Sequence, residues 1–186
     1  SVTIGLRSWN LDNWGEDIIA LDIDAGIYLW NTSGGISTAS NVASAITNAP
    51  TKSKFMIVSN PDRHLICFGT ETTIGTTSTQ DPMFIRWSDQ DDFNDWTPSA
   101  TNSSGSQRVT GGSKIVTAIS TRGQILFLTD TSAHGMSFIG APFTFGFQKL
   151  GTNCGAVSPH CAVDISGLVY WMSSDGFYMF DGTVRK

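Results

Sequence analysis

The sequence predicts an all-β protein built from repeated antiparallel hairpins and meanders, in the manner of a β-propeller. Short apolar runs rich in Val, Ile, Phe, Tyr and Trp alternate with Gly, Asp, Asn and Ser along the 186 residues. This alternation is typical of strands joined by tight turns. Few segments keep a helical period over ten residues, and the predicted hairpins recur along the chain. Together these observations favour a repeated β architecture.

Four pairs of strands are predicted around turn-forming residues. Asn60-Pro61-Asp62-Arg63 is the clearest turn, because proline presets one backbone dihedral angle and Asn and Asp favour local hydrogen bonds. The fourth pair is followed by a further strand at 177–180. The predicted pairs are 18–21 with 27–30, 55–59 with 64–68, 114–120 with 124–129, and 162–165 with 168–172.

One segment has a helical pattern. Residues 39–49 place Val42, Ala45, Ile46 and Ala49 on one face at helical spacing, and a proline follows directly. We therefore expect at most one short helix in the chain.

The hairpins repeat at intervals that suit propeller blades. Each has a turn before an aromatic or aliphatic strand, at Gly26, Arg63, Gly123 and Gly167. The intervals from 26 to 63, 63 to 123 and 123 to 167 are 37, 60 and 44 residues, and an extra loop at 89–113 fills the longest. A four-stranded blade uses about 40–50 residues. A β-sandwich is the alternative, since it needs similar strands, but it does not call for a repeated motif.

The length corresponds to a single β-rich domain over residues 1–186. The sequence begins at Ser1 without an initiator methionine and stops at Lys186 directly after an apolar run. We expect it to be a piece of a longer protein. The three cysteines are an odd set without zinc-site spacing, and we expect reduced thiols.

The net charge of the chain limits the classes of partner that we expect. Lys and Arg total 11 against 16 Asp and Glu, which gives a net charge of −5. A surface for nucleic acid or for an anionic membrane needs a local excess of cations, so both are disfavoured. No apolar run approaches the 18 residues of a membrane-spanning helix.

The acidic stretch 87–96 is the most unusual local sequence. It fails as an EF-hand calcium loop, because Phe93, Asn94 and Ala100 stand at positions 5, 6 and 12. We expect the Asp side chains to cap backbone amides while the two Trp anchor the loop on the sheet. A bound cation or glycan is the alternative. The candidate interaction or anchoring residues are Trp87, Asp89, Asp91, Asp92, Asp95 and Trp96.

Signatures of catalysis are weak in this sequence. Only two glutamates are present, and neither a Gly-x-Ser-x-Gly elbow nor a His-Glu-x-x-His motif occurs. Gly111-Gly112-Ser113-Lys114 lacks the spacing of a phosphate loop and leads into a β-branched run. We therefore predict no catalytic residue, no metal site and no cofactor.

Nine motifs in order resemble virion structural proteins of tailed bacteriophages, of the tail tubular, nozzle or packaged-DNA stabilisation type. They span residues 10–182, so the resemblance covers nearly the whole chain. The motifs are Asn10-Leu-Asp-Asn-Trp-Gly-Glu-Asp-Ile-Ile-Ala20, Tyr28-Leu-Trp30, Phe84-Ile-Arg-Trp-Ser-Asp89, Asp95-Trp-Thr-Pro98, Gly123-Gln-Ile-Leu-Phe-Leu-Thr-Asp130, Phe138-Ile-Gly-Ala-Pro-Phe143, Asn153-Cys-Gly155, Val169-Tyr-Trp-Met172 and Gly176-Phe-Tyr-Met-Phe-Asp-Gly182.

The resemblance implies a propeller-like, non-enzymatic module in the virion tail. Its expected partners are copies of its own parent chain in a ring or tube and other tail proteins. Packaged DNA would pass nearby without tight binding, and no membrane is involved. Two alternatives stay open: a carbohydrate-binding adhesin that uses exposed Trp and Asp on propeller loops, and a propeller-type glycosidase.

Overall fold

The structure is a computed structural model that describes residues 7–36, 41–60 and 62–186. Pro61 of the predicted turn and residues 39–40 of the predicted helix lie outside the described residues. The described chain forms four antiparallel sheets of four strands each, and in every sheet the strands follow one another in sequence order. The prediction of an all-β fold made of repeated hairpins is confirmed.

Each sheet is therefore a continuous meander. The first sheet contains β1 (Trp9–Trp14), β2 (Asp17–Asp22), β3 (Gly26–Trp30) and β4 (Ser44–Ala45). The second contains β5 (Phe55–Val58), β6 (Leu65–Phe68), β7 (Phe84–Trp87) and β8 (Gly105–Arg108). The third contains β9 (Ile115–Ser120), β10 (Ile125–Thr129), β11 (Ser132–Phe138) and β12 (Phe145–Thr152). The fourth contains β13 (Ala162–Ile165), β14 (Leu168–Ser173), β15 (Gly176–Phe180) and β16 (Val184–Arg185).

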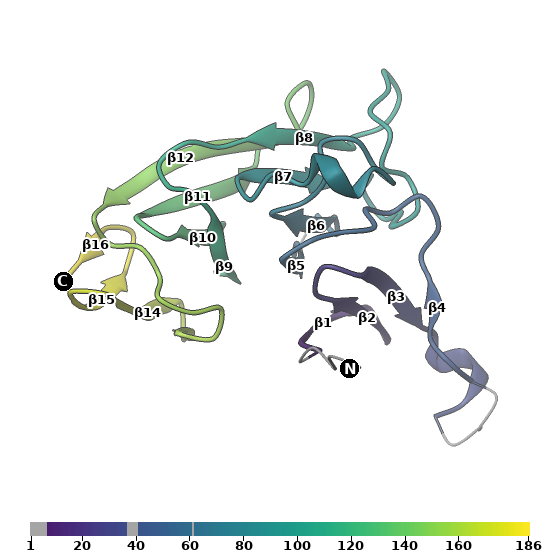
Figure 1. Cartoon of the computed structure of the whole chain (residues 1–186), viewed down its shortest axis with the longest axis horizontal. Coiled ribbons are helices and arrows are strands. Elements are labelled where there is room, and N and C mark those ends of the chain that lie inside the picture. Colours follow the sequence, from purple (N-terminus) through teal and green to yellow (C-terminus); the bar gives the residue numbers. More distant parts are fainter. Residues whose placement is uncertain (1–6, 37–40, 61) are drawn as a thin grey trace, which may run out of the picture.

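The four sheets follow one another along an arch, with the first and fourth sheets at its two ends (Figure 1). The first strands of consecutive sheets, β1, β5, β9 and β13, contact one another in series. This is how the blades of a propeller succeed one another, although here the arch is not a closed ring (Figure 1). Two short 3-10 helices, η1 (Thr32–Gly34) and η2 (Thr77–Thr79), lie in the connections.

Consecutive sheets are held together by three apolar cores. The first core joins sheets one and two, the second joins sheets two and three, and the third joins sheets three and four. Each core contains large side chains that are at most 1% exposed: Trp96 and Leu65 in the first, Phe68 and Phe127 in the second, and Trp171 and Leu126 in the third.

Strands of the middle sheets are apolar at consecutive positions because both of their faces are covered. Every residue of β6 and of β10 is buried. Residues of β6 alternate between the two neighbouring sheets, since Leu65 and Cys67 pack in the first core and Ile66 and Phe68 in the second. The apolar runs in the sequence therefore report two-sided burial.

The four predicted strand pairs are confirmed, but the first pair has a different position in its sheet from the other three. The pairs in sheets two, three and four are the first hairpin of their sheet, whereas 18–21 with 27–30 is the second hairpin, β2–β3. The equivalent turn of the first sheet lies at Gly15, whose φ of +65° suits glycine. Strand β1 was missed because Asn and Asp interrupt its apolar residues.

The helix predicted at 39–49 is wrong over its described part. Ser44–Ala45 form β4, which pairs with Leu29 and Tyr28 at the edge of the first sheet. Val42, expected on the buried face of the helix, is exposed. Hydrogen bonding to the free edge of β3 outweighs a short helical pattern, since an isolated helix of this length has little stability of its own.

Candidate functional site

The two tryptophans of the acidic stretch are buried anchors at the start and the end of the loop that follows β7. Trp87 is the last residue of β7, and its indole N–H donates to the Ser103 carbonyl oxygen at 2.9 Å. Trp96 is 1% exposed in the core between the first and second sheets, and its indole N–H donates to the Phe93 carbonyl oxygen at 2.7 Å. Neither ring presents a face to solvent on which a sugar could stack.

Two of the four predicted carboxylates bind the loop's own polar groups. Asp92 Oδ1 accepts a hydrogen bond from the Asn94 amide at 2.8 Å. Asp95 accepts from the Thr97 amide at 3.2 Å and from the Asn102 side-chain amide at 2.9 Å. These are Asx-type contacts, in which a short side chain replaces a backbone acceptor.

The other two carboxylates connect the loop to neighbouring segments. Asp91 forms an exposed ion pair with Arg63 at 3.0 Å, in the turn between β5 and β6. Asp89 Oδ1 accepts from the Ser103 amide at 2.7 Å and from the Ser103 hydroxyl at 2.6 Å. Burial alone would raise the pKa of Asp89, but these hydrogen bonds outweigh it and lower the pKa below its ordinary value.

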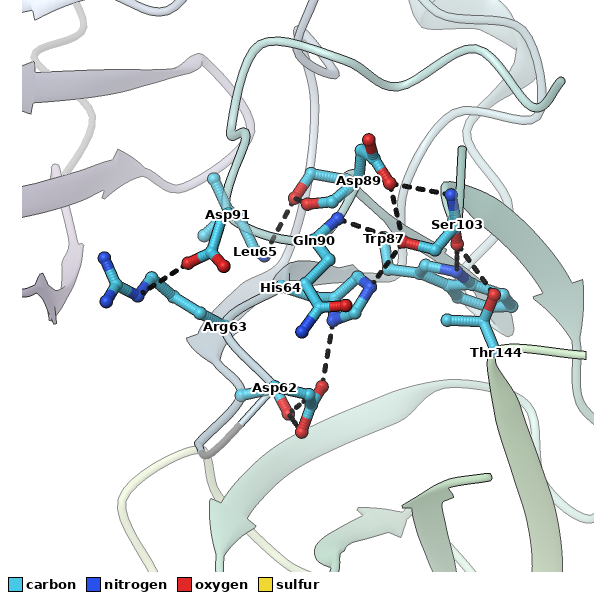
Figure 2. Close-up of polar contacts among 12 residues, drawn as sticks. Asp62, Arg63, His64, Leu65, Trp87, Asp89, Gln90, Asp91, Ser103 and Thr144 are labelled. Carbon is cyan, nitrogen blue, oxygen red and sulfur yellow. Dashed lines mark hydrogen bonds and ion pairs between the residues drawn. The ribbon is translucent and has the colours of Figure 1, made fainter. Parts of the chain in front are cut away.

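The structure also assembles a histidine-centred cluster that the sequence analysis missed (Figure 2). His64 is 0% exposed, and its Nδ1–H donates to Asp62 Oδ2 at 2.9 Å. Its Nε2 lies 2.9 Å from the Ser103 hydroxyl. Asp62 also accepts from the Ser59 hydroxyl, at 2.7 and 2.8 Å. A serine, a histidine and an aspartate thus stand in the order of a nucleophile, a base and an orienting acid.

Ser103 makes more contacts than a nucleophilic serine would. Its hydroxyl accepts from the Gln90 amide at 3.0 Å and lies closer to Asp89 than to His64. A hydroxyl has one proton, and the nearer carboxylate is the stronger acceptor for it. The Ser103 carbonyl oxygen accepts from Trp87 and, at 2.8 Å, from the Thr144 hydroxyl of the third sheet's β11–β12 connection. Ser103 therefore links the acidic loop, the turn between β5 and β6, and the third sheet.

Aromatic rings cover the histidine. Its ring centroid lies 5.7 Å from that of Phe138 and 5.1 Å from that of Phe145. A groove of about 440 Å³ opens beside the cluster, lined by Gln90, Ser103, Phe138 and Thr144 among others, but the imidazole does not line it. Any molecule in this groove would meet the serine and not the histidine.

Of this cluster, only the proximity of Asp62 and His64 could have been predicted from the sequence. Asp62 and His64 are two residues apart in the turn between β5 and β6, so they lie close together for local reasons. Ser103 is 39 residues from His64, within a run of Ser, Thr and Asn that has no distinguishing pattern. Folding of the loop onto its sheet is needed to bring it there.

The structure also shows the state of the three cysteines and the arrangement of the possible metal ligands. Cys67, Cys154 and Cys161 are free thiols, and burial raises the pKa of Cys67 to about 12. Among residues 7–36, 41–60 and 62–186, no three His, Cys, Asp or Glu side chains gather as a metal site. The carboxylates of the acidic loop are instead directed at amides, hydroxyls and Arg63.

Within the described residues, the two end sheets each have one face against which no other sheet packs, and these faces form the second candidate site. We call them the fourth-sheet face and the first-sheet face. The fourth-sheet face consists of Val163, Ile165, Leu168, Tyr170, Met172 and Phe177, which are all exposed. Strand register places them on one side, because Tyr170 lies opposite Val163, Leu168 opposite Ile165, and Met172 opposite Phe177.

The first-sheet face is built in the same way. Its apolar residues are Trp9, Leu11, Ile18, Ala20, Tyr28 and Trp30, and the strand register places the polar residues Asn13 and Asp22 on the same side. Leu11, Ala20 and Tyr28 stand opposite one another across three strands, and the rings of Trp9 and Tyr28 lie 6.1 Å apart. Trp9 and Leu11 are exposed, and the other four apolar residues are partly exposed. Contiguous apolar surface of this kind is typical of interaction sites.

The described part of the chain contains no helix with the length and apolar character to cross a bilayer. Comparison with protein-family models and with curated proteins gave no match to this chain.

Proposed function

We propose that this protein is a non-enzymatic structural component of a bacteriophage tail, a module of the tail tube or nozzle type in the virion. In this role it assembles with copies of its parent chain and with other tail proteins. The observation that carries the proposal is the pair of exposed apolar faces at the two ends of the arch. The ordered motifs that resemble tail proteins supply the biological setting.

The charge distribution is suited to a wall past which DNA moves. Six of the 11 Lys and Arg residues lie within 4 Å of a carboxylate. Paired cations on a chain of net charge −5 offer little attraction to phosphate, so DNA would pass without being retained.

The histidine-centred cluster supports a role without catalysis. Its imidazole is fully buried, and the Ser103 hydroxyl is engaged by Asp89 and by the Gln90 amide. The same residues link the acidic loop to two sheets, which is a sufficient reason for their presence. The glycosidase alternative would need a carboxylate pair open to a substrate, whereas the loop carboxylates bind their own chain.

The carbohydrate-binding alternative loses its expected contact residues. Trp87 and Trp96 are buried, so neither can stack on a sugar ring. Substitution of Trp96 would disturb the core between the first two sheets rather than a glycan contact.

The decisive experiment is imaging of the intact phage particle that contains this protein, at a resolution that shows side chains. We expect to find the chain in several copies around the tail axis, with its apolar end faces covered. Location in the capsid shell, or absence from the particle, would contradict the proposal. A panel of chromogenic glycosides provides the second arm, and turnover abolished by Ser103→Ala would contradict the non-enzymatic role.

A further inference from the structure

We propose that the groove between β8 and β12 binds a phosphate group, held by His134, Lys149 and Arg108. The walls of this groove are edge strands of the second and third sheets, on the convex side of the arch (Figure 1). The groove has a volume of about 310 Å³, and Gln107 and Phe147 also line it. None of these residues belongs to the acidic loop or to an end face, so the site goes beyond the proposed role in the tail.

His134 is a buried imidazole with one nitrogen open to the groove. The residue is 5% exposed, and its ring stacks on that of Phe127 with the centroids 5.0 Å apart. Its Nε2 lies 3.1 Å from the Ser132 hydroxyl, which donates its single proton to the Gly111 carbonyl oxygen, so Nε2–H is the donor to Ser132. Nδ1 has no hydrogen-bond partner among the described residues and is not enclosed, so it is the nitrogen that faces the groove.

Lys149 places a cation without a counter-ion beside this histidine. Strand register sets it directly opposite His134 across β11 and β12. Within the described part of the chain, no carboxylate lies within 4 Å of its ammonium group. The ammonium lies over Gly111, where a Cβ atom would come within 3.1 Å of Nζ. The groove therefore holds a positive charge that its own surroundings leave available to an anion.

Arg108 supplies a second cation from the opposite wall of the groove. Its Nε donates to Asp81 at 2.6 Å, and its other two guanidinium nitrogens have no partner among the described residues. Guanidinium and ammonium groups bind phosphate through charge-assisted hydrogen bonds. A phosphate group offers at least three acceptor oxygens and a charge of about −1.5 to −2 at pH 7, whereas a carboxylate offers two oxygens and one charge. Phosphate is therefore the better match to three donors.

Binding of phosphate here should take up a proton. Burial and the Lys149 ammonium both lower the pKa of His134 below its ordinary value, so at pH 7 the ring is neutral and Nδ1 presents a lone pair to the groove. A lone pair repels a phosphate oxygen, so the complex needs a proton on Nδ1 or on the phosphate. The other charged groups nearby are Arg108 with Asp81, and Asp130, which accepts hydrogen bonds from the β8–β9 connection. The affinity should therefore rise as the pH falls from 8 to 6.

NMR titration of the His134 imidazole in the folded chain is the direct test, with inorganic phosphate as the probe. At constant ionic strength, we expect phosphate to shift the ring resonances of His134 in a saturable way and to move its titration midpoint to higher pH. His64 and His160 do not line the groove and serve as internal references, whose resonances should stay in place. The same shift of His134 with sodium chloride would mean simple screening of Lys149 and would overturn the proposal.

Lys149→Gln removes the unpaired cation at an exposed position, where the fold does not depend on it. The dissociation constant for phosphate, measured by calorimetry, should rise at least about tenfold, as for the loss of a charge-assisted hydrogen bond. Lys52→Gln is the matched control, since Lys52 also forms no ion pair among the described residues and does not line the groove. Equal losses in the two variants would indicate nonspecific attraction and contradict the site.

A second probe identifies the source of the phosphate. A short DNA duplex without terminal phosphates is titrated in the same way as inorganic phosphate. A shift of His134 with DNA that Lys149→Gln abolishes would assign the groove to the nucleic-acid backbone, and a shift with inorganic phosphate alone would assign it to a free phosphate. Both results support the site. The absence of any shift with either probe, up to about 10 mM phosphate, would overturn it.

Discussion

At the scale of single residues, the buried polar groups of this protein serve to attach loops to sheets. His64 and Ser103 illustrate this, because His64 joins Asp62 of its own turn to Ser103, and the Ser103 carbonyl oxygen accepts from the third sheet. A buried polar group without a partner costs free energy, so these contacts are coupled. Removal of one member is expected to leave the others unsatisfied.

His64→Ala should lower the free energy of unfolding by about 2–4 kcal/mol, because it removes the buried hydrogen bond to Asp62 and the contact with Ser103, and leaves a cavity under Phe138 and Phe145. Urea denaturation measures the change. His160→Ala is the matched control, since His160 is exposed and its loss should cost under about 0.5 kcal/mol. Equal effects of the two substitutions would show that the cluster has no structural role.

The lowered pKa of Asp62 predicts that the stability of the fold depends on pH. Burial raises its pKa, but hydrogen bonds from His64 and Ser59 outweigh this and lower the pKa below its ordinary value. A carboxyl with a lowered pKa in the folded state stabilises the fold at pH values above the unfolded pKa, about 4. That contribution is lost as the pH falls from about 4 through the lowered pKa.

Urea denaturation of wild type and Asp62→Asn between pH 3 and pH 7 would test this expectation. The wild type should lose stability toward pH 3 more steeply than the variant, which lacks the titrating group. Parallel curves would contradict the role assigned to this carboxylate.

At the scale of elements, strand pairing depends on which residues stand opposite one another. Gly105 in β8 lies opposite Trp87 in β7, and the absence of a side chain makes room for the indole ring. A Cβ atom at Gly105 would lie 2.5 Å from the ring of Trp87. Because this indole also donates a hydrogen bond to the Ser103 carbonyl oxygen, it cannot move without disturbing the loop between β7 and β8.

Gly105→Ala should therefore destabilise the protein by about 1–3 kcal/mol, as expected for overpacking of a core. Thermal unfolding followed by tryptophan fluorescence measures the effect. Gly123→Ala is the control, because nothing lies within 4 Å of the added atom there. A melting temperature unchanged by Gly105→Ala would mean that the indole has another position available.

Two of the strands that the sequence analysis missed, β4 and β8, lie at the edges of their sheets and have no apolar pattern. Strand β8 has the sequence Gly-Ser-Gln-Arg, and β4 has only two residues. Neither has an apolar alternation, and both are defined by hydrogen bonds to β7 and β3. Local sequence patterns cannot reveal a strand whose only determinant is the edge that it pairs with.

At the scale of the whole molecule, the sheets in the middle of the arch are covered on both faces by neighbouring sheets, whereas the sheets at its ends are covered on one face. The second and third sheets have a neighbour on both faces, whereas the fourth sheet has one. Local opening is easiest where few apolar contacts must be broken. The first and fourth sheets should therefore be the least stable parts of the isolated chain.

Amide hydrogen exchange of the isolated chain tests this gradient. Amides of β14 should exchange faster than those of β6 and β10, because only one face of β14 is covered. Uniform protection across all four sheets would contradict the prediction.

The strands of the four predicted hairpins, their turns and the repetition of the hairpin followed from the sequence because they depend on local properties: alternation of apolar residues, and Gly, Pro and Asn at turns. The anchoring of the acidic loop was also expected from its Asp and Trp residues. The contact between His64 and Ser103, and the apolar faces left open on the first and fourth sheets, appeared only in the tertiary structure. The reason is physical. Burial and long-range contacts depend on which sheets lie next to one another, and the sequence of a single strand does not specify which sheet will pack against it.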